Sequence, residues 1–190
     1  MKKTAVLALL IVLMISLVSC GEESDIPDGM KEASGDAAVF DMFVPESWIV
    51  DLQTGAVSAH VSETDRSNVS VMAWKLKSSS DTVDDWWEIH SEELSTAFPD
   101  MSEVEIDTAT LGGVAAKKYT YTVSLNGEEG TEDNAGGAGS SAVEYKYMQI
   151  AAVKSGSVFV LTYTAEPDNF DGNLDDVMSI ARELRYRPGL

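Results

Sequence analysis

The sequence predicts an α+β fold, in which helices flank an antiparallel β-sheet of about seven strands. Most of the strand-like segments alternate apolar and polar residues with a period of two, and polar turns join them. Two further segments repeat apolar residues every three or four positions, which is typical of amphipathic helices. Because hairpin-joined strands pair antiparallel, the helices are expected to pack on the faces of one sheet.

The first half of the chain contains three of these strands. They are predicted at 38–44, 55–63 and 68–74, and Pro45 ends the first. In the second strand, the alternation places His60 on the polar side with Ser58 and Ser62. The ring of His60 is therefore expected to be exposed.

A helix follows in the segment SDTVDDWWEIHSEELSTAFPD. Ser80 or Asp81 can cap its first N–H groups, and Pro99 stops it. His90 falls on the apolar side of this helix, so a packed or hydrogen-bonded ring is expected there rather than a metal ligand or a catalytic base.

Trp86 and Trp87 are adjacent in this helix and therefore point about 100° apart. One can face the core while the other lies at its edge, where an exposed tryptophan is a frequent interface anchor. The two are candidate partner-binding residues, although packing of both at the core boundary is an equally good interpretation.

The second half contains four strands and a final helix. The strands are predicted at 103–111, 114–125, 142–153 and 157–165, and the last is apolar on both faces, which indicates a strand covered on both sides. Asn173 is the predicted cap of the final helix. The apolar stripe of this helix comprises Leu174, Val177, Met178, Ala181 and Leu184.

Residues 126–141 are Gly-rich and acidic and are predicted to form a loop between two of the strands. Its acidic side chains are further candidates for partner binding: Glu128, Glu129, Glu132 and Asp133. Calcium prefers several oxygen ligands, but the loop lacks the D-x-D-x-D-G spacing of a calcium loop. A solvated loop is therefore favoured over a metal site.

The N-terminus predicts a secretory signal and a lipid anchor. Lys2 and Lys3 precede an apolar run that is too short to span a bilayer, which requires about 20 residues. The run ends in Leu17-Val18-Ser19-Cys20, which resembles the lipobox of bacterial lipoproteins. Cys20 is the only cysteine, so it cannot form an internal disulfide. We expect cleavage before Cys20 and acylation of its sulfur. These steps would place the protein on the extracytoplasmic face of the cell membrane. The alternative is that Cys20 is an ordinary free cysteine.

Residues 1–19 are thus the predicted signal peptide, residues 20–36 a lipidated cysteine with a flexible acidic tether, and residues 37–190 a single domain. Loss of Lys2 and Lys3 changes the net charge from −19 to about −21. This charge argues against a nucleic-acid partner, because phosphates would repel it. It also argues against the domain lying flat on anionic lipid.

The order of the elements resembles the PsbP-like family over roughly residues 38–187. Pro45 with Trp48, and the segment from Val160 to Ala165 followed by Phe170, are the best-matching parts. The resemblance implies an αβα sandwich and, because members of the family are generally non-enzymatic, a role in binding or assembly.

Catalytic motifs are absent from the sequence. It contains no G-x-S-x-G, no phosphate-binding loop and no second His or Cys at metal spacing, so we predict no catalytic residue, metal ligand or cofactor. The leading hypothesis is a lipid-anchored extracytoplasmic binding or assembly factor for an envelope complex, with an envelope protein as its partner. The alternatives are a tethered receptor for a small ligand or metal ion and, with less support, a membrane-tethered hydrolase.

Overall fold

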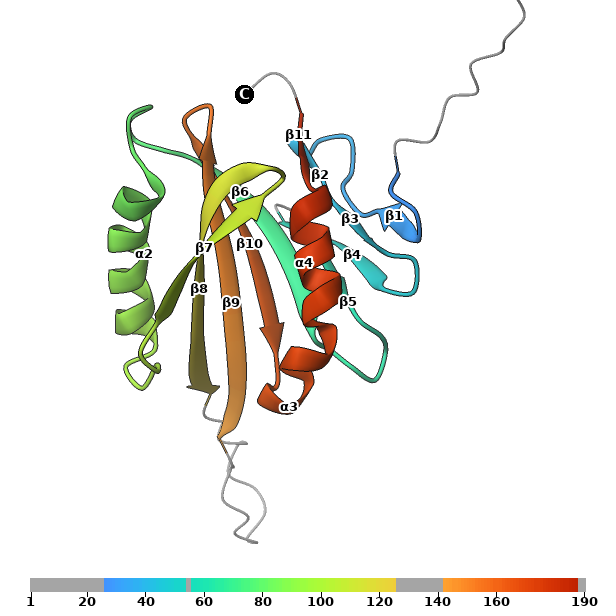
Figure 1. Ribbon diagram of the computed structural model, residues 1–190. Helices are drawn as coiled ribbons and strands as arrows, with labels where there is room; N and C mark the ends of the chain where they lie inside the picture. Colours follow the sequence, from blue (N-terminus) through green and yellow to red (C-terminus); the bar gives the residue numbers. More distant parts are fainter. Residues whose placement is uncertain (1–25, 54–55, 126–141, 188–190) are drawn as a thin grey trace, which may run out of the picture.

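The computed structural model describes residues 26–53, 56–125 and 142–187 (Figure 1). A seven-stranded antiparallel sheet in the order β4–β5–β6–β10–β9–β8–β7 forms its centre. The bounds of its strands are β4 Ile49–Gln53, β5 Ala56–His60, β6 Asn68–Lys75, β7 Glu105–Leu111, β8 Val114–Leu125, β9 Val143–Lys154 and β10 Ser157–Ala165.

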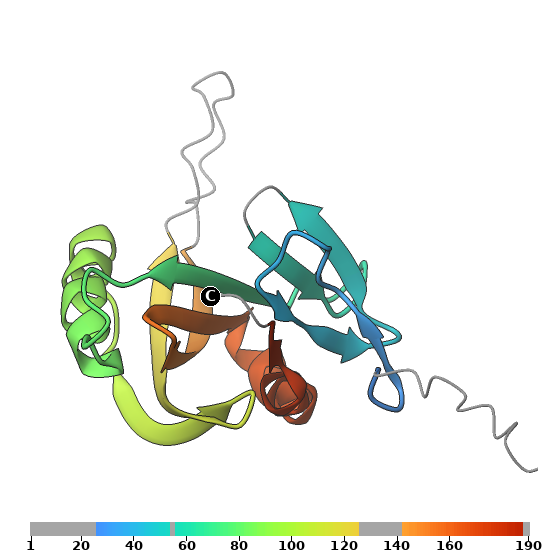
Figure 2. The ribbon, with the colours of Figure 1, turned by 90° about the horizontal axis from the view of Figure 1, so that it is seen from above.

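Helices lie on both faces of this sheet, so the predicted α+β sandwich is confirmed. Helix α2 (Val83–Ala97) covers one face, and α4 (Leu174–Glu183) covers the other (Figure 2). The short helices α3 (Pro167–Phe170) and η1 (Asp171–Asn173) lead into α4. Two small sheets pair β1 (Met30–Glu32) with β3 (Phe43–Pro45), and β11 (Arg185–Tyr186) with β2 (Phe40–Asp41).

Strand β10 separates two hydrophobic cores, as its two apolar faces predict. Phe159 and Leu161 point into the larger core, which also contains Trp48 and residues of α4. Val158 and Val160 point into the smaller core under α2, which contains Tyr119. Because successive side chains of a strand alternate between faces, both faces of β10 must be covered.

The seven strands of the sheet are not the seven that the sequence predicts. The predicted strand 38–44 is interrupted at the buried Met42 and forms β2 and β3, which pair outside the main sheet. The main sheet contains β4 instead, a strand that the sequence pattern does not predict. The backbone of Met42 instead bonds to the two residues that follow β1, since its C=O accepts from the N–H of Ala33 and its N–H donates to Ser34 Oγ.

The folded part of the chain begins earlier than the boundary predicted at residue 37. Strand β1 pairs antiparallel with β3, so that Lys31 lies opposite Val44, and Ala33 is buried. Residues 30–33 therefore belong to the domain rather than to the predicted flexible tether. Residues 20–25 of that tether lie outside the described residues.

The ends of the two long helices differ in detail from the prediction. Thr82, not Ser80 or Asp81, caps α2: Thr82 Oγ1 accepts from the N–H of Asp85, and Asp85 Oδ2 accepts from the N–H of Thr82. This reciprocal pair is a capping box. Asn173 stands at the predicted N-cap of α4, but its side chain makes no capping bond.

The buried face of α4 is also rotated relative to the predicted stripe. Ile180 is fully buried, whereas Met178, a member of that stripe, is exposed. The other residues of the stripe pack as expected, because Val177, Ala181 and Leu184 belong to the larger core and Leu174 packs against it.

The turn between β7 and β8 supplies a matched pair of variants. Gly112 and Gly113 have φ of 54° and 73°. A Cβ on Gly112 would lie 2.5 Å from the carbonyl oxygen of Leu184, whereas a Cβ on Gly113 would meet nothing within 4 Å. We expect Gly113→Ala to lower the free energy of unfolding by about 1 kcal/mol through backbone strain alone. Gly112→Ala should lower it by roughly 3 kcal/mol, because steric overlap adds to the strain. Urea denaturation measures both values, and equal losses would contradict the tight contact between this turn and the end of α4.

Candidate ligand-binding cleft

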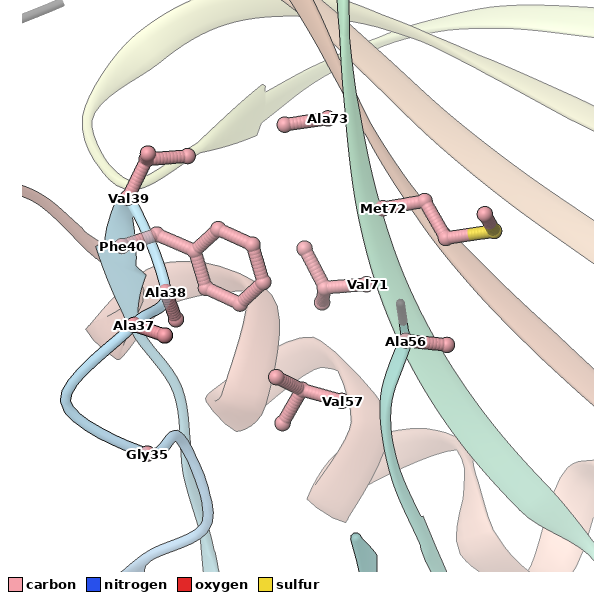
Figure 3. Close-up of a pocket in the computed structure, with 10 residues that line it drawn as sticks. All are labelled: Gly35, Ala37, Ala38, Val39, Phe40, Ala56, Val57, Val71, Met72 and Ala73. Carbon is pink, nitrogen blue, oxygen red and sulfur yellow. The ribbon is translucent and has the colours of Figure 1, made fainter. Parts of the chain in front are cut away.

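An apolar cleft of about 320 Å³ opens between the N-terminal segment and the sheet (Figure 3). One wall is the segment 35–40, and the other is formed by β5 and β6. Phe40, Val57 and Val71 project into the space between the walls, while Met72 and Ala56 point away from it (Figure 3). The cleft therefore lies at the open end of the larger core.

The guanidinium group of Arg187 fixes the wall formed by residues 35–40. Its nitrogens donate to three backbone carbonyls and to two carboxylates. Nη1 donates to the carbonyls of Gly35, Asp36 and Ala38 at 3.0, 3.0 and 2.9 Å, Nε to Asp41 Oδ1 at 2.6 Å, and Nη2 to Glu32 Oε1 at 3.1 Å. Hydrogen bonds to a charged donor are stronger than neutral ones. An irregular segment is thereby held as a defined surface.

The side chains that line the cleft are all apolar. The N-terminal wall contributes Ala37, Ala38, Val39 and Phe40 beside Gly35. The sheet wall contributes Val57, Val71 and Ala73, together with the backbone at Ala56 and Met72. A polar group buried there would lose its bonds to water without a side-chain replacement, at a cost of about 1–3 kcal/mol. The cleft is therefore suited to an apolar group.

His60 is buried rather than exposed, which corrects the sequence-based prediction. Its residue exposure is 5 %, and its Nδ1 lies 2.7 Å from Asp51 Oδ2. Nη1 of Arg66 lies 3.1 Å from Nε2 of the ring. A neutral ring that donates from Nδ1 to Asp51 and accepts at Nε2 from Arg66 satisfies both contacts. Because both nitrogens are engaged, the ring serves as a structural link.

The aromatic residues of α2 pack on the smaller core. Trp87 stacks on Tyr119 with ring centroids 3.7 Å apart, and Trp86 stacks on His90 at 4.6 Å. Both tryptophans are half-buried. The large apolar side chain that α2 exposes most is Ile89, at 49 %. A partner-binding role of Trp86 and Trp87 stays a prediction.

Three polar atoms are buried without a hydrogen-bond partner in this part of the molecule: Nε2 of His90, Oε1 of Gln149 and the hydroxyl of Tyr119. Burial lowers the pKa of His90, an effect that Gln149 and Glu93 partly oppose. Burial, with a smaller contribution from Asp84, raises the pKa of Tyr119 to about 12. His90 therefore favours its neutral form in the folded state, as a packed ring requires.

Other predicted site residues lie outside the described residues, namely Cys20 and the acidic loop residues Glu128, Glu129, Glu132 and Asp133. Within residues 26–53, 56–125 and 142–187, no group of three or more His, Cys, Asp or Glu side chains could hold a metal ion. No helix in those ranges has the length and apolar character needed to cross a membrane.

Comparison with known proteins supports the fold. The sequence matches no family model, and no curated protein matches it. Among solved structures, the cyanobacterial PsbP of Synechocystis is similar with a TM-score of 0.56 and 16 % identity, over 90 % of this chain and 98 % of that one. A Bacteroides thetaiotaomicron protein is similar with a TM-score of 0.53 and 14 % identity. That match covers 84 % of this chain but only 49 % of the Bacteroides chain. The chain therefore has a PsbP-like fold, and at these identities the fold is all that the similarity shows.

Arg187 holds the wall formed by residues 35–40, and its replacement tests that role. We expect Arg187→Ala to lower the free energy of unfolding by roughly 2–3 kcal/mol, because it leaves carbonyls and carboxylates without their donor. Amide hydrogen exchange in residues 35–41 should accelerate. Arg182→Ala is the matched control: that side chain is 67 % exposed, against 25 % for Arg187, so its loss should cost less than about 0.5 kcal/mol. Equal effects of the two variants would show that Arg187 does not hold the wall.

His90 makes the stability of the protein depend on pH. Because its pKa is lower in the folded than in the unfolded protein, the unfolded state binds more protons at mildly acidic pH. The stabilisation is therefore complete above the ordinary histidine pKa of about 6.5 and is lost as the pH falls below it. Urea denaturation between pH 7.5 and 5 should show a smaller loss of stability in His90→Gln than in the wild type. Identical pH slopes would contradict this assignment.

Proposed function

We propose that this chain is a lipid-anchored extracytoplasmic binding protein, without a catalytic role, that serves an envelope complex through its apolar cleft. The signal-like segment 1–19 and the lipobox at Cys20 support the anchoring and the location. The PsbP-like fold is compatible with a binding role. The observation that carries the proposal is the cleft itself, an apolar surface with one wall held in place by Arg187.

The anchor would keep the domain close to the bilayer. Six peptide units separate Cys20 from Ile26, and a fully extended chain of that length spans about 20 Å. The acidic surface would at the same time repel anionic headgroups. The proposed geometry is a domain that stays near the membrane without lying on it.

The hydrolase hypothesis has less support from the described residues. Both ring nitrogens of His60 are engaged by Asp51 and Arg66. His90 is stacked against Trp86, and its Nε2 is buried. A general base must reach the proton that it removes, and neither ring is placed to do so for a hydroxyl nucleophile. The small-ligand receptor uses the same cleft and differs from the leading proposal only in what fills it.

A photocrosslinking amino acid with a small aliphatic diazirine side chain at Ala37 tests the proposed function. Ala37 is exposed and lines the cleft, so irradiation of living cells should yield an adduct on the membrane-bound protein. The same amino acid at Ala97, which is exposed on α2, is the matched control and should yield none of that adduct. Cys20→Ser should abolish the adduct together with membrane attachment, because the domain is then no longer held near its target.

Intact-mass spectrometry of the native protein completes this test. The mature chain should begin at Cys20 and carry the mass of the lipid. An unprocessed N-terminus, or equal adducts from Ala37 and Ala97, would refute the proposal.

A further inference from the structure

We infer that the cleft receives the aliphatic chain of a membrane lipid whose headgroup is neutral or cationic. This inference rests on the proposed function, since it names what the cleft of the anchored protein binds.

The side chains of the lining favour a group that lacks hydrogen-bonding atoms. None of the ten lining residues has a polar side chain. An inserted peptide would bring backbone N–H and C=O groups that require partners. On the N-terminal wall, the carbonyls of Gly35, Asp36 and Ala38 already accept from Arg187. A hydrocarbon chain has no groups that require hydrogen-bond partners.

The size and shape of the cleft favour a single flexible chain. Its volume of about 320 Å³ is at the lower end of the range for ligand sites, about 300–1,000 Å³. The facing side chains are mainly Ala and Val, and the ring of Phe40 is held in edge contact with Phe159, with centroids 6.3 Å apart. Each methylene buried between such walls adds to the affinity.

Charge at the opening selects the headgroup. Asp36 is exposed and lies between two lining residues, Gly35 and Ala37. The chain as a whole carries a net charge of −19. A sulfate or phosphate headgroup there would be repelled by Asp36 and by the net negative charge of the chain, whereas a neutral headgroup would not be, and a cationic one would be attracted.

The proposed anchor would hold the cleft close to membrane lipids. The chain enters the domain at Ile26 and β1, and β1 pairs with β3 in the same N-terminal layer that provides one wall of the cleft (Figure 2). With Cys20 acylated, six peptide units would separate this layer from the bilayer, so membrane lipids are the apolar molecules nearest to the opening.

Photoactivatable ten-carbon alkyl probes test the inference. Three probes carry a glyceryl, a trimethylammonium or a sulfate headgroup, and each is added to the mature lipoprotein in phosphatidylcholine nanodiscs. Peptide mapping should place the label in residues 35–40 and 56–73. The glyceryl and trimethylammonium probes should label at least about tenfold more than the sulfate probe, through charge repulsion at the opening.

Two variants and one control decide whether the cleft is the site. Ala73→Phe fills the cleft, and Ala37→Trp obstructs its exposed opening without adding volume to the core; each should reduce labelling about tenfold, a loss of about 1.4 kcal/mol in binding. Ala97→Phe adds the same ring to the exposed end of α2 and should leave labelling unchanged. Thermal unfolding verifies that each variant is folded.

Labelling that is equal for all three headgroups, or that is located on α2, would overturn the inference, as would labelling unaffected by Ala37→Trp. A protein adduct at Ala37 in cells, without probe labelling in nanodiscs, would refute the lipid as occupant and leave the proposed function standing. The absence of both would refute the two together.

Discussion

Strand β10 imposes the main constraint on this fold, because it is apolar on both faces and must be covered on both. Each Å² of apolar surface left in water would forfeit about 25 cal/mol. Helix α2 covers the smaller core around Val158 and Val160. The larger core around Phe159 and Leu161 is wider than one helix, so α4 shares it with β2, β3 and the segment that contains Trp48. The cleft lies where this composite layer meets the end of the β5–β6 pair.

The composite layer depends on Arg187, which joins the end of the described chain to its beginning. Its partners Asp41 and Glu32 precede it by 146 and 155 residues. A planar guanidinium can donate in several directions at once, as these five acceptors require, and a lysine ammonium group cannot reproduce that fork. The N-terminal layer is therefore complete only when the C-terminal strand β11 has paired with β2. The wall of the cleft therefore depends on contacts between the two ends of the described chain rather than on a local motif.

The sequence predicts the elements that have their own periodicity. Such patterns are local to one strand or helix. Examples are the alternation in β8 and β9, the two apolar faces of β10 and the helical repeat of α2. Strand β1 has no such pattern, since Met30–Glu32 contains a single apolar residue and is defined only by its partner β3. The predicted exposure of His60 is wrong for a related reason. The alternation places His60 on the polar side of its strand, but Asp51 from β4 and Arg66 from the following loop contact its ring. The cleft combines residues 35–40, 56–57 and 71–73, so no linear pattern could reveal it.

The cleft and the aromatic residues of α2 are the two apolar features most relevant to binding, and the packing distinguishes between them. None of the residues of α2 is fully buried, so the helix is attached to the sheet mainly through half-buried side chains such as Trp86 and Trp87. The stacking of Trp87 on Tyr119 is therefore needed to close the smaller core, and a partner that withdrew it would expose β10. The cleft has no such structural duty, because Phe40 and Val71, which line it, are already buried in the larger core. The cleft therefore offers apolar surface that the fold does not require, beside a wall that Arg187 holds in place. It is the feature of this domain most available to a ligand.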